Sequence, residues 1–376
     1  MQYEVKRALR SVMTGQIIFN PKSIAVVLGT RPEIVKLAHI IRMLGDAARV
    51  IHTGQHYDPN LSETFFQEME LPPPDLFLQV GGTSRGHQIG EGVKALDAYF
   101  ATDPPRAVVV QGDTNAVTAG ALAANAREIF LCHIEGGLRS HDRAMPEEHN
   151  RVITDHLSDL TCAPTDVSVD NLLREGIPQD RIALTGNTIV EAVQHLMPSP
   201  DERARILAKY ELTAGRYALS TFHRPENVDN RERFAAILHE LATLSIPVLL
   251  PLHPRSVATA SAFGLDDLLA KIRVEEPIGY REFLALEAES AVMVSDSGGI
   301  AEEASIVKRP VVVVRNSTER PEVMGTFATR VAAGPAIGAE ARRMIDEGWF
   351  HLEDIPSPYG DGTASQKSLE ALANRL

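Results

Sequence analysis

Short runs of apolar and β-branched residues recur along this chain, and helix-like stretches separate them. Strands that alternate with helices form a parallel, doubly wound sheet, because each helix returns the chain to the edge where the next strand starts. The first half contains runs at 23–29, 49–54, 107–113, 130–136, 159–165 and 182–187. The pattern begins again with runs at 216–223, 247–253, 272–277, 291–298 and 310–316. The sequence therefore predicts an α/β protein with two Rossmann-like, doubly wound domains that face a cleft lined by strand ends.

The break between the two halves falls near 187–200, where a helix-like stretch ends in proline-rich sequence. We expect an N-terminal extension, a first domain, a second domain and a C-terminal helix, at 1–22, 23–187, 188–358 and 359–376. The last helix can pack back on the first domain. Two domains also agree with the length of 376 residues, since one domain typically has about 100–200.

The composition narrows the classes of partner. The formal net charge of −13 argues against nucleic acid, which binds electropositive faces. A phosphorylated small ligand stays open, because a few basic side chains or a helix N-terminus suffice to bind it. The two cysteines, Cys132 and Cys162, are too few for a disulfide framework or a cysteine-based zinc site, and they suit a reducing compartment.

Several common signatures are missing from the sequence. No apolar run is long enough to span a membrane, and no secretory signal is recognisable, so a cytoplasmic protein is expected. Neither the G-x-G-x-x-G fingerprint nor the G-x-x-x-x-G-K-[ST] loop is found. The pattern therefore disfavours a dehydrogenase and a P-loop kinase.

Polar residues gather where strands of the first half end. Arg31 and Lys36 follow the first strand and suit a phosphate or carboxylate, although solvated charges of an ordinary turn are the alternative. Asp113 ends the third run and is either a helix cap or a functional acid. Glu135 stands where the next strand stops, before two glycines that permit close approach of a ligand.

Two acidic residues, Glu147 and Glu148, open a helix further along the first half. Acidic side chains in a first turn commonly interact with the helix dipole. For Glu148 we favour that structural role.

The second half carries groups that suit anions. His223 follows its first strand beside Arg and Glu, which makes it a candidate for acid–base or phosphate chemistry. Ser297 and Gly298 enter a helix whose N–H groups are available to an anion. Glu303, one turn further on, can accept hydrogen bonds from ribose hydroxyls, and Arg320 adds a cation. The distribution suits a ligand with its phosphates on the second half and its sugar against the first.

Together these clusters resemble the non-hydrolysing UDP-N-acetylglucosamine 2-epimerases. The matching strings, in one order across residues 28–322, are GTRPEIVK, TGQHYD, QGDTN, HIEGGLRS, MPEEHNR, GNTIV, HRPENV, PLHPR, SDSGGIAEEA and TERPE. A further family string, PYGDG, stands at 359–363. A series of this kind is far more specific than any one of its motifs.

The resemblance implies an isomerase with the two-domain GT-B-like fold, commonly a homodimer, that interconverts UDP-GlcNAc and UDP-ManNAc. The family is thought to eliminate UDP to a 2-acetamidoglucal and to add it back after reprotonation, so neither a redox cofactor nor a metal is expected. The implied catalytic residues are Asp113, Glu135, Glu147 and His223. The implied substrate-binding residues are Arg31, Lys36, His56, Arg139, Arg151, Phe283, Ser297, Gly298, Gly299, Glu303 and Arg320. The resemblance does not tell which of the three carboxylates removes the proton and which returns it. Closure of the two halves is expected to be required for turnover.

Two positions depart from the commonest family pattern. Gly136 stands where Ala is usual, which is a small change at the level of sequence. Residues 55–58 read Gln-His-Tyr-Asp, whereas members that their own substrate activates tend to carry Gln-His-Arg. Hyperbolic kinetics are therefore expected.

Three alternatives remain at this stage. Family members that act on UDP-2,3-diacetamido uronic acids share the TGQHYD region but tend to carry GARPQ in the first loop, where this chain has GTRPE. A GT-B glycosyltransferase would need an acceptor groove, which no motif marks. A catalytically silent sensor would be expected to have lost a carboxylate, yet Asp113, Glu135 and Glu147 are all present.

Overall fold

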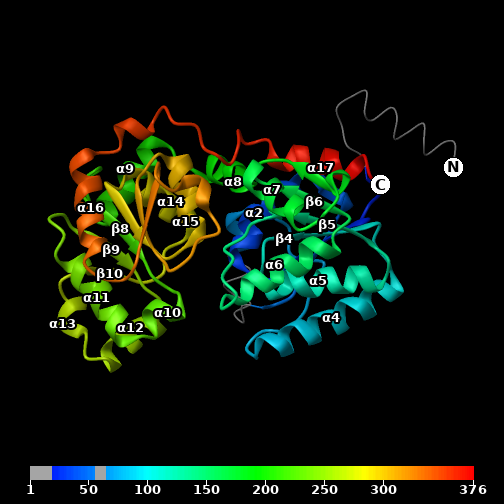
Figure 1. Ribbon diagram of the computed structural model, residues 1–376, viewed down its shortest axis with the longest axis horizontal. Helices are drawn as coiled ribbons and strands as arrows, with labels where there is room; N and C mark the ends of the chain where they lie inside the picture. Colours follow the sequence, from blue (N-terminus) through cyan, green and yellow to red (C-terminus); the bar gives the residue numbers. More distant parts are fainter. Residues whose placement is uncertain (1–18, 56–64) are drawn as a thin grey trace. The chain divides into compact units, whose positions relative to one another are not determined.

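The computed structural model describes residues 19–55 and 65–376, which form two compact units (Figure 1). Unit 1 comprises the described residues up to Ala192 together with Tyr359–Leu376, and unit 2 comprises Val193–Pro358. The boundary at 192 lies inside α8 (Ile189–Leu196). Of the predicted extension at 1–22, residues 1–18 lie outside the described residues.

Unit 1 contains a parallel sheet whose described strands lie in the order β3-β2-β1-β4-β5-β6-β7. The strands are β1 (Ile24–Leu28), β2 (Ala48–His52), β3 (Leu76–Phe77), β4 (Ala107–Gln111), β5 (Phe130–Ile134), β6 (Leu160–Ala163) and β7 (Ile182–Leu184). The helices around it are α2 (Arg31–Leu44), α4 (Arg85–Thr102), α5 (Asn115–Ala126), α6 (Pro146–Leu157), α7 (Asp166–Arg174), part of α8, and α17 (Ala364–Ala373). Because β1, β4 and β5 are neighbours, the loops that follow them meet at one edge.

Unit 2 repeats this plan with strands in the order β10-β9-β8-β11-β12-β13. These are β8 (Ala218–Thr221), β9 (Val248–Pro251), β10 (Arg273–Glu275), β11 (Val292–Ser295), β12 (Val311–Val314) and β13 (Ala328–Val331). The helices are α9 (Pro200–Lys209), α10 (Pro225–Val228), α11 (Arg231–Ala242), α12 (Pro254–Ala262), α13 (Asp266–Leu269), α14 (Tyr280–Glu289), α15 (Gly298–Val307) and α16 (Ala336–Glu347). The predicted α/β class, with two Rossmann-like parallel sheets, is confirmed.

The central strands are mostly apolar because helices cover both faces of each sheet. Every residue of β1 and of β12 is buried, and both strands consist of aliphatic residues.

Side-chain caps determine where two of the helices begin. The Thr114 hydroxyl accepts a hydrogen bond from the Val117 N–H at the start of α5, and Ser297 caps α15 in the same way.

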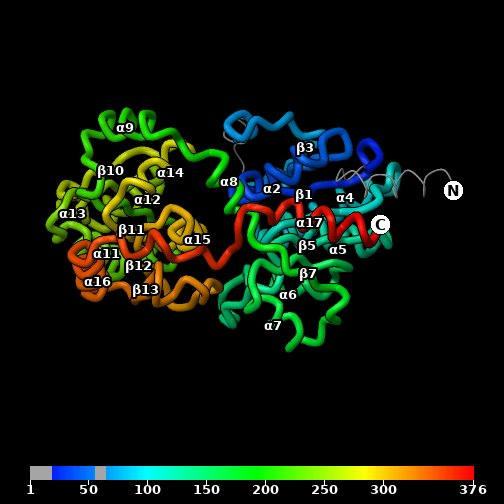
Figure 2. The backbone as a smooth tube through the Cα atoms, turned by 90° about the horizontal axis from the view of Figure 1, so that it is seen from above, coloured from blue at the N-terminus to red at the C-terminus, as the bar shows by residue number. Residues whose placement is uncertain are grey.

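The helix α17 belongs to unit 1 although the whole of unit 2 precedes it in the chain. Figure 2 shows this last segment, in red, running over unit 1, where it packs against α2 and β6. The Asn187 N–H donates to the Tyr359 carbonyl at 2.9 Å, and Glu191 accepts hydrogen bonds from the Ser365 N–H and hydroxyl. Hydrogen bonds therefore anchor the returning segment at two places.

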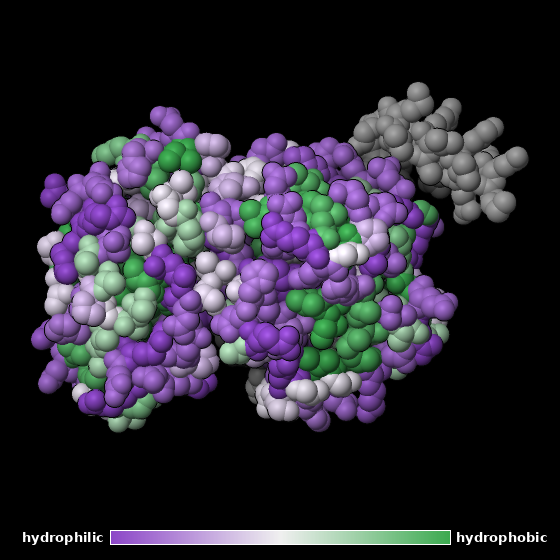
Figure 3. Space-filling view, in the orientation of Figure 1, coloured by the Kyte–Doolittle hydropathy of each residue, from purple (hydrophilic) through white to green (hydrophobic). Residues whose placement is uncertain are grey.

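The surface of the described residues carries a few large exposed apolar side chains. Four of them, Ile153, Val167, Leu173 and Leu184, lie on α6, α7 and β7 of unit 1. Apolar patches stand out on the face of unit 1 in Figure 3, within a largely hydrophilic surface. In the part of the chain that the structure describes, no helix has both the length and the hydropathy to cross a membrane.

Candidate active site

Helix α2, which follows β1, and the loop after β5 bring a lysine and a glutamate into a buried ion pair. The Lys36 ammonium lies 2.5 Å from Oε2 of Glu135, and the two side chains are only 7% and 4% exposed. Gln111, the last residue of β4, donates its side-chain amide to the same oxygen at 3.0 Å. These contacts fix the position of Glu135, and the ammonium supplies the opposite charge that a buried carboxylate needs.

The backbone of Glu135 is itself unusual, with a φ of +64° in the left-handed region. A side chain with a β-carbon adopts this conformation at a cost of about 1–2 kcal/mol. Such strained residues persist when their surroundings over-determine them, and they concentrate at functional sites. The geometry therefore supports a functional role for Glu135.

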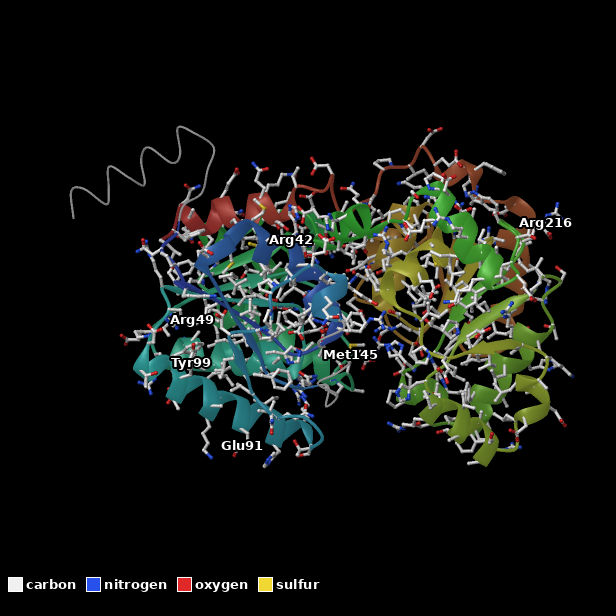
Figure 4. The ribbon with its side chains drawn as sticks, turned by 180° about the vertical axis from the view of Figure 1, so that it is seen from behind. Arg42, Arg49, Glu91, Tyr99, Met145 and Arg216 are labelled. Atoms are coloured by element: carbon white, nitrogen blue, oxygen red, sulfur yellow. The ribbon has the colours of Figure 1, made fainter. Side chains whose placement is uncertain are left out.

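Asp113 and Glu148 share one arginine at this edge. Arg151 of α6 donates from Nε to Asp113 at 3.2 Å and pairs through its terminal nitrogens with both Asp113 and Glu148. Met145, labelled in Figure 4 at the start of α6, has its sulfur 4.0 Å from an Arg151 nitrogen. Arg49 and Tyr99, labelled in the same view, lie at the opposite side of unit 1, at the start of β2 and the end of α4.

The two neighbouring glutamates of α6 have different environments. Glu148 is buried and accepts hydrogen bonds from the Ser140 N–H and hydroxyl, each at 3.0 Å, and from the His141 N–H at 2.8 Å. Burial alone would raise the pKa of Glu148, but these N–H groups and Arg151 outweigh it and lower the pKa below its ordinary value. The side chain of Glu147 is exposed and forms no hydrogen bond or ion pair with any described residue. Its carboxylate is thus available to a ligand.

Arg31 and Lys36, the two cations predicted to follow the first strand, lie in different surroundings. Lys36 is buried against Glu135, whereas the Arg31 guanidinium lies 4.1 Å from the centre of the Phe65 ring. His56, the third polar residue expected near this loop, lies outside the described residues.

Glu33, in the first turn of α2, is a buried acid beside the site. It accepts hydrogen bonds from the Gly29 N–H at 3.1 Å and the Thr114 hydroxyl at 3.0 Å, so it links the loops after β1 and β4. Burial raises the pKa of Glu33 from 4.5 to about 7, and hydrogen bonds from Thr30, Gly29 and Thr114 offset part of that rise.

The raised pKa of Glu33 predicts a pH-dependent stability. Between pH 4.5 and about 7 the folded protein holds a proton that this carboxyl loses on unfolding. The free energy of unfolding should therefore fall as pH rises through this window, by at most about 3 kcal/mol. Glu33→Gln mimics the neutral acid and should flatten the change. Urea unfolding of both proteins at several pH values measures it, and parallel curves would show that Glu33 ionises normally.

Arg139 lies below the loop of Glu135 and binds internal acceptors. It forms two hydrogen bonds with Glu175, at 2.7 and 2.6 Å, and one with Asp155 at 2.7 Å. Its side chain is 1% exposed. These partners give it a structural role in unit 1, and its predicted contact with substrate stays a prediction.

In unit 2, His223 and the N-terminus of α15 meet around a buried aspartate. Nδ1 of His223 lies 3.0 Å from Oδ1 of Asp296, and the imidazole is 62% exposed while the carboxylate is fully buried. Asp296 also accepts hydrogen bonds from the Arg224 N–H and the Asn227 amide. Burial alone would raise the pKa of Asp296, but His223 and Asn227 outweigh it and lower the pKa. The ring is therefore held at one nitrogen and exposed at the other.

The start of α15 is built for close approach of an anion. Ser297 caps the helix, and a β-carbon on Gly298 would lie 2.6 Å from a Glu319 carboxylate oxygen. Gly299 follows within the first turn, where N–H groups lack partners inside the helix. The backbone can approach an anion closely here because no side chain intervenes.

The remaining predicted residues of unit 2 lie around α14 and α15. Glu303 is buried and accepts a 2.5 Å hydrogen bond from the Tyr280 hydroxyl. Arg320 is buried and donates to Glu302 at 2.5 Å. Phe283 is half-buried on α14.

No cluster of acidic, histidine or cysteine side chains among the described residues could hold a metal ion.

Sequence reasoning missed several partners of these residues. It assigned no role to Gln111, Asp155, Tyr280 or Asp296, although Gln111 and Asp296 stand inside motifs that it selected. Their spacing places them at strand ends but does not tell which side chain they face. Asp155 and Tyr280 lie on helices, Asp155 outside the selected motifs and Tyr280 three residues before Phe283, and no role was predicted for either.

Comparison with known proteins identifies the family of the chain. A family model described as UDP-N-acetylglucosamine 2-epimerase matches residues 45–373. Proteins named UDP-N-acetylglucosamine 2-epimerase from Methanococcus maripaludis and Methanocaldococcus jannaschii are 42% and 39% identical to this chain. The two alignments cover 91% and 93% of this chain and 96% and 98% of the relatives. A crystal structure of the Methanocaldococcus jannaschii enzyme in complex with UDP-GlcNAc and UDP has a TM-score of 0.84, at 38% identity, over 93% of this chain and 99% of that one.

Two further likenesses bear on the alternatives. A UDP-2,3-diacetamido-2,3-dideoxy-D-glucuronate 2-epimerase from Pseudomonas aeruginosa is 34% identical over 93% of this chain and 99% of its own length. A glycosyltransferase structure from Rickettsia africae, covering 95% of this chain and 94% of that one, has a TM-score of 0.52 at 14% identity, which speaks for a shared fold alone.

Proposed function

Because the chain belongs to the UDP-N-acetylglucosamine 2-epimerase family, we propose that it interconverts UDP-GlcNAc and UDP-ManNAc by inverting carbon 2 of the sugar. The observation that carries the proposal is the likeness of nearly the whole chain to epimerases of that name. The protein is an isomerase on the same ground.

The reaction needs elimination because carbon 2 has no neighbouring carbonyl to stabilise a carbanion. The bond between carbon 1 and the phosphate oxygen breaks, and its electron pair leaves with UDP. The proton at carbon 2 passes to a carboxylate, and a double bond forms between carbons 1 and 2. A proton then adds to the opposite face of carbon 2, and the UDP oxygen bonds to carbon 1 again. We assign the proton transfers to Asp113, Glu135 and Glu147.

Unit 2 supplies the groups that hold UDP in this proposal. His223, oriented by Asp296, supports the departing phosphate, and the N–H groups at the start of α15 bind phosphate oxygens. Glu303 accepts hydrogen bonds from the ribose, and Phe283 flanks the uracil. Arg31, Lys36, Arg151 and Arg320 supply positive charge along the substrate.

The decisive experiment follows UDP-GlcNAc with the protein in D₂O by NMR. Deuterium should enter carbon 2 while UDP-ManNAc accumulates, because the proton exchanges with solvent between its removal and its return. An unchanged spectrum with folded protein would refute the proposal.

A second substrate is worth the same assay. The Pseudomonas aeruginosa relative is named for a UDP-diacetamido uronate, so that sugar is the alternative substrate. The GTRPE loop of this chain favours UDP-GlcNAc. A higher kcat/KM for the diacetamido uronate would reverse the assignment.

The neighbouring glutamates of α6 offer a matched pair of variants. Glu147→Gln should lower turnover about 10²–10⁴-fold without changing the melting temperature, because its exposed carboxylate supports no described contact. Glu148→Gln should lower the free energy of unfolding by about 1–3 kcal/mol, because the amide loses the negative charge beside Arg151 and keeps one acceptor oxygen where the carboxylate has two. NMR turnover and thermal unfolding measure both. Full activity in Glu147→Gln would remove it from the reaction.

We propose a homodimer in the cytoplasm as the working form. The exposed apolar residues of α6, α7 and β7 offer a surface for a second copy, and the two buried free cysteines fit a reducing compartment. Light scattering should give a mass of twice 41.0 kDa, and a monomer at micromolar concentration would contradict the assembly.

A further inference from the structure

A buried polar network lies beneath the two loops that carry Asp113 and Glu135. His133, the fourth residue of β5, is fully buried, and its Nδ1 lies 2.7 Å from Oδ1 of Asp155 on α6. Oδ2 of Asp155 accepts hydrogen bonds from Arg139 at 2.7 Å and from the Gly137 N–H at 3.1 Å. All of these residues belong to unit 1.

His133 bridges two acceptors. Nε2 lies 2.8 Å from the Gly112 carbonyl oxygen, which can only accept, and Nδ1 lies 2.7 Å from the Asp155 carboxylate. The ring therefore connects the loop after β4 to α6. Burial by itself would raise the pKa of Asp155, but His133 and Arg139 outweigh it and lower the pKa, which keeps the carboxylate charged. Asp155 thus joins His133 to Arg139, and Arg139 in turn binds Glu175.

The network holds both functional loops by their backbones. The Gly112 carbonyl, bound by His133, directly precedes Asp113. The Gly137 N–H, bound by Asp155, comes two residues after Glu135. Gly112, Glu135 and Gly137 all have left-handed backbones, with φ of +79°, +64° and +83°. Only Glu135 is strained there, because glycine adopts a positive φ without that cost, and a strained residue needs fixed partners to persist.

The residues around the network are tightly packed. A β-carbon on Gly136 would lie 2.2 Å from a Thr161 methyl carbon and 2.5 Å from Oδ1 of Asp155. The glycine that stands where Ala is usual therefore accommodates the pair of His133 and Asp155. The packing around residue 136 leaves no room for the β-carbon of an alanine, so glycine is required there.

We propose that His133 and Asp155 are positioning residues for epimerisation, because they fix the backbones that aim Asp113 and Glu135 at the sugar. This proposal rests on the proposed function of the same site. Neither residue touches the substrate, since both side chains are fully buried. A displacement of about 1 Å in a catalytic group can lower a rate about 100-fold. Loss of the network should accordingly lower kcat more than it changes KM.

The test compares amide variants of the two residues. In His133→Asn the amide takes the place of Nδ1 and retains a donor to Asp155, whereas in His133→Gln it reaches towards the Gly112 carbonyl. Both replace the imidazole with an amide. Asp155→Asn and His133→Asn should lower kcat about 10- to 100-fold with the Kd for UDP unchanged, and His133→Gln should recover part of that loss.

Asp159→Asn is the matched control. Asp159 accepts the Leu131 N–H at 2.8 Å near the start of β5, at the other end of the strand from Glu135. It should lower the melting temperature and leave kcat unchanged in folded protein. All rates are measured well below the melting temperature, with circular dichroism to establish the folded fraction.

Each outcome has one meaning. If Asp155→Asn keeps the wild-type kcat, or if His133→Gln is no better than His133→Asn, the positioning role is refuted. If every variant follows Asp159→Asn in losing stability alone, the network is structural and the proposal fails. If the wild-type protein incorporates no deuterium, the proposed function has failed instead, which the wild-type arm reveals first.

Discussion

Asp113→Asn will remove nearly all epimerisation and leave UDP binding intact. General acid–base catalysis typically contributes about 10²–10⁴-fold to a rate, so turnover should fall by that factor. The amide keeps the size of the side chain and can still contact Arg151, which Glu148 continues to hold. UDP affinity should not change, because the proposed UDP groups lie in unit 2.

NMR turnover in D₂O and calorimetric titration with UDP measure the two halves of this prediction. Asp97→Asn is the control, because Asp97 also pairs with an arginine of unit 1, Arg127, at 2.5 and 2.8 Å, but lies on α4 away from the strand ends. Asp97→Asn should keep its turnover. Wild-type turnover in Asp113→Asn would exclude Asp113 from the proton transfers.

Lys36→Met should destabilise the protein as well as inactivate it. The variant leaves the Glu135 carboxylate buried without the ammonium that now lies 2.5 Å away. Removing one partner of a buried ion pair costs about 3–5 kcal/mol, because the other charge stays desolvated. Turnover should fall at least 100-fold, since a displaced or protonated Glu135 can no longer take its part in the proton transfers.

The double variant Lys36→Met, Glu135→Gln separates the two effects. With the charge of residue 135 removed, the free energy of unfolding should return most of the way to the wild-type value, while activity stays lost. Gln111 can still bond residue 135 in that variant. Urea unfolding provides the free energies. If the free energy of unfolding of Lys36→Met is less than about 1 kcal/mol below that of the wild type, solvent reaches Glu135 and compensates its charge.

The pattern of apolar runs predicted most of the fold, because central parallel strands are buried on both faces. It missed β3 and β13, which lie at edges of the two sheets. Leu76 and Phe77 of β3 are half-buried and exposed, and only Ala328 of the four residues of β13 is buried. Edge strands contact one neighbour only, so their composition carries a weaker signal.

The positions of the candidate residues were predictable, but their partnerships were not. Arg31 and Lys36 read as one basic pair, yet one stacks on Phe65 and the other is buried against Glu135. Glu147 and Glu148 are adjacent, yet one is exposed and the other anchors a loop. Spacing assigns a residue to a strand end or a helix turn. The direction of its side chain depends on packing between elements distant in the sequence.

The return of α17 to unit 1 has a consequence for synthesis. Unit 2 is one continuous segment, whereas unit 1 is assembled from residues on both sides of it. Domains generally fold as the chain emerges from the ribosome, N-terminal parts first. Here the first sheet emerges early but cannot make its contacts with α17 until all of Val193–Pro358 has been translated. The apolar surface on α2 and β6 that α17 covers therefore stays open throughout the translation of unit 2, which makes this interval the stage at which the nascent chain depends most on protection from aggregation.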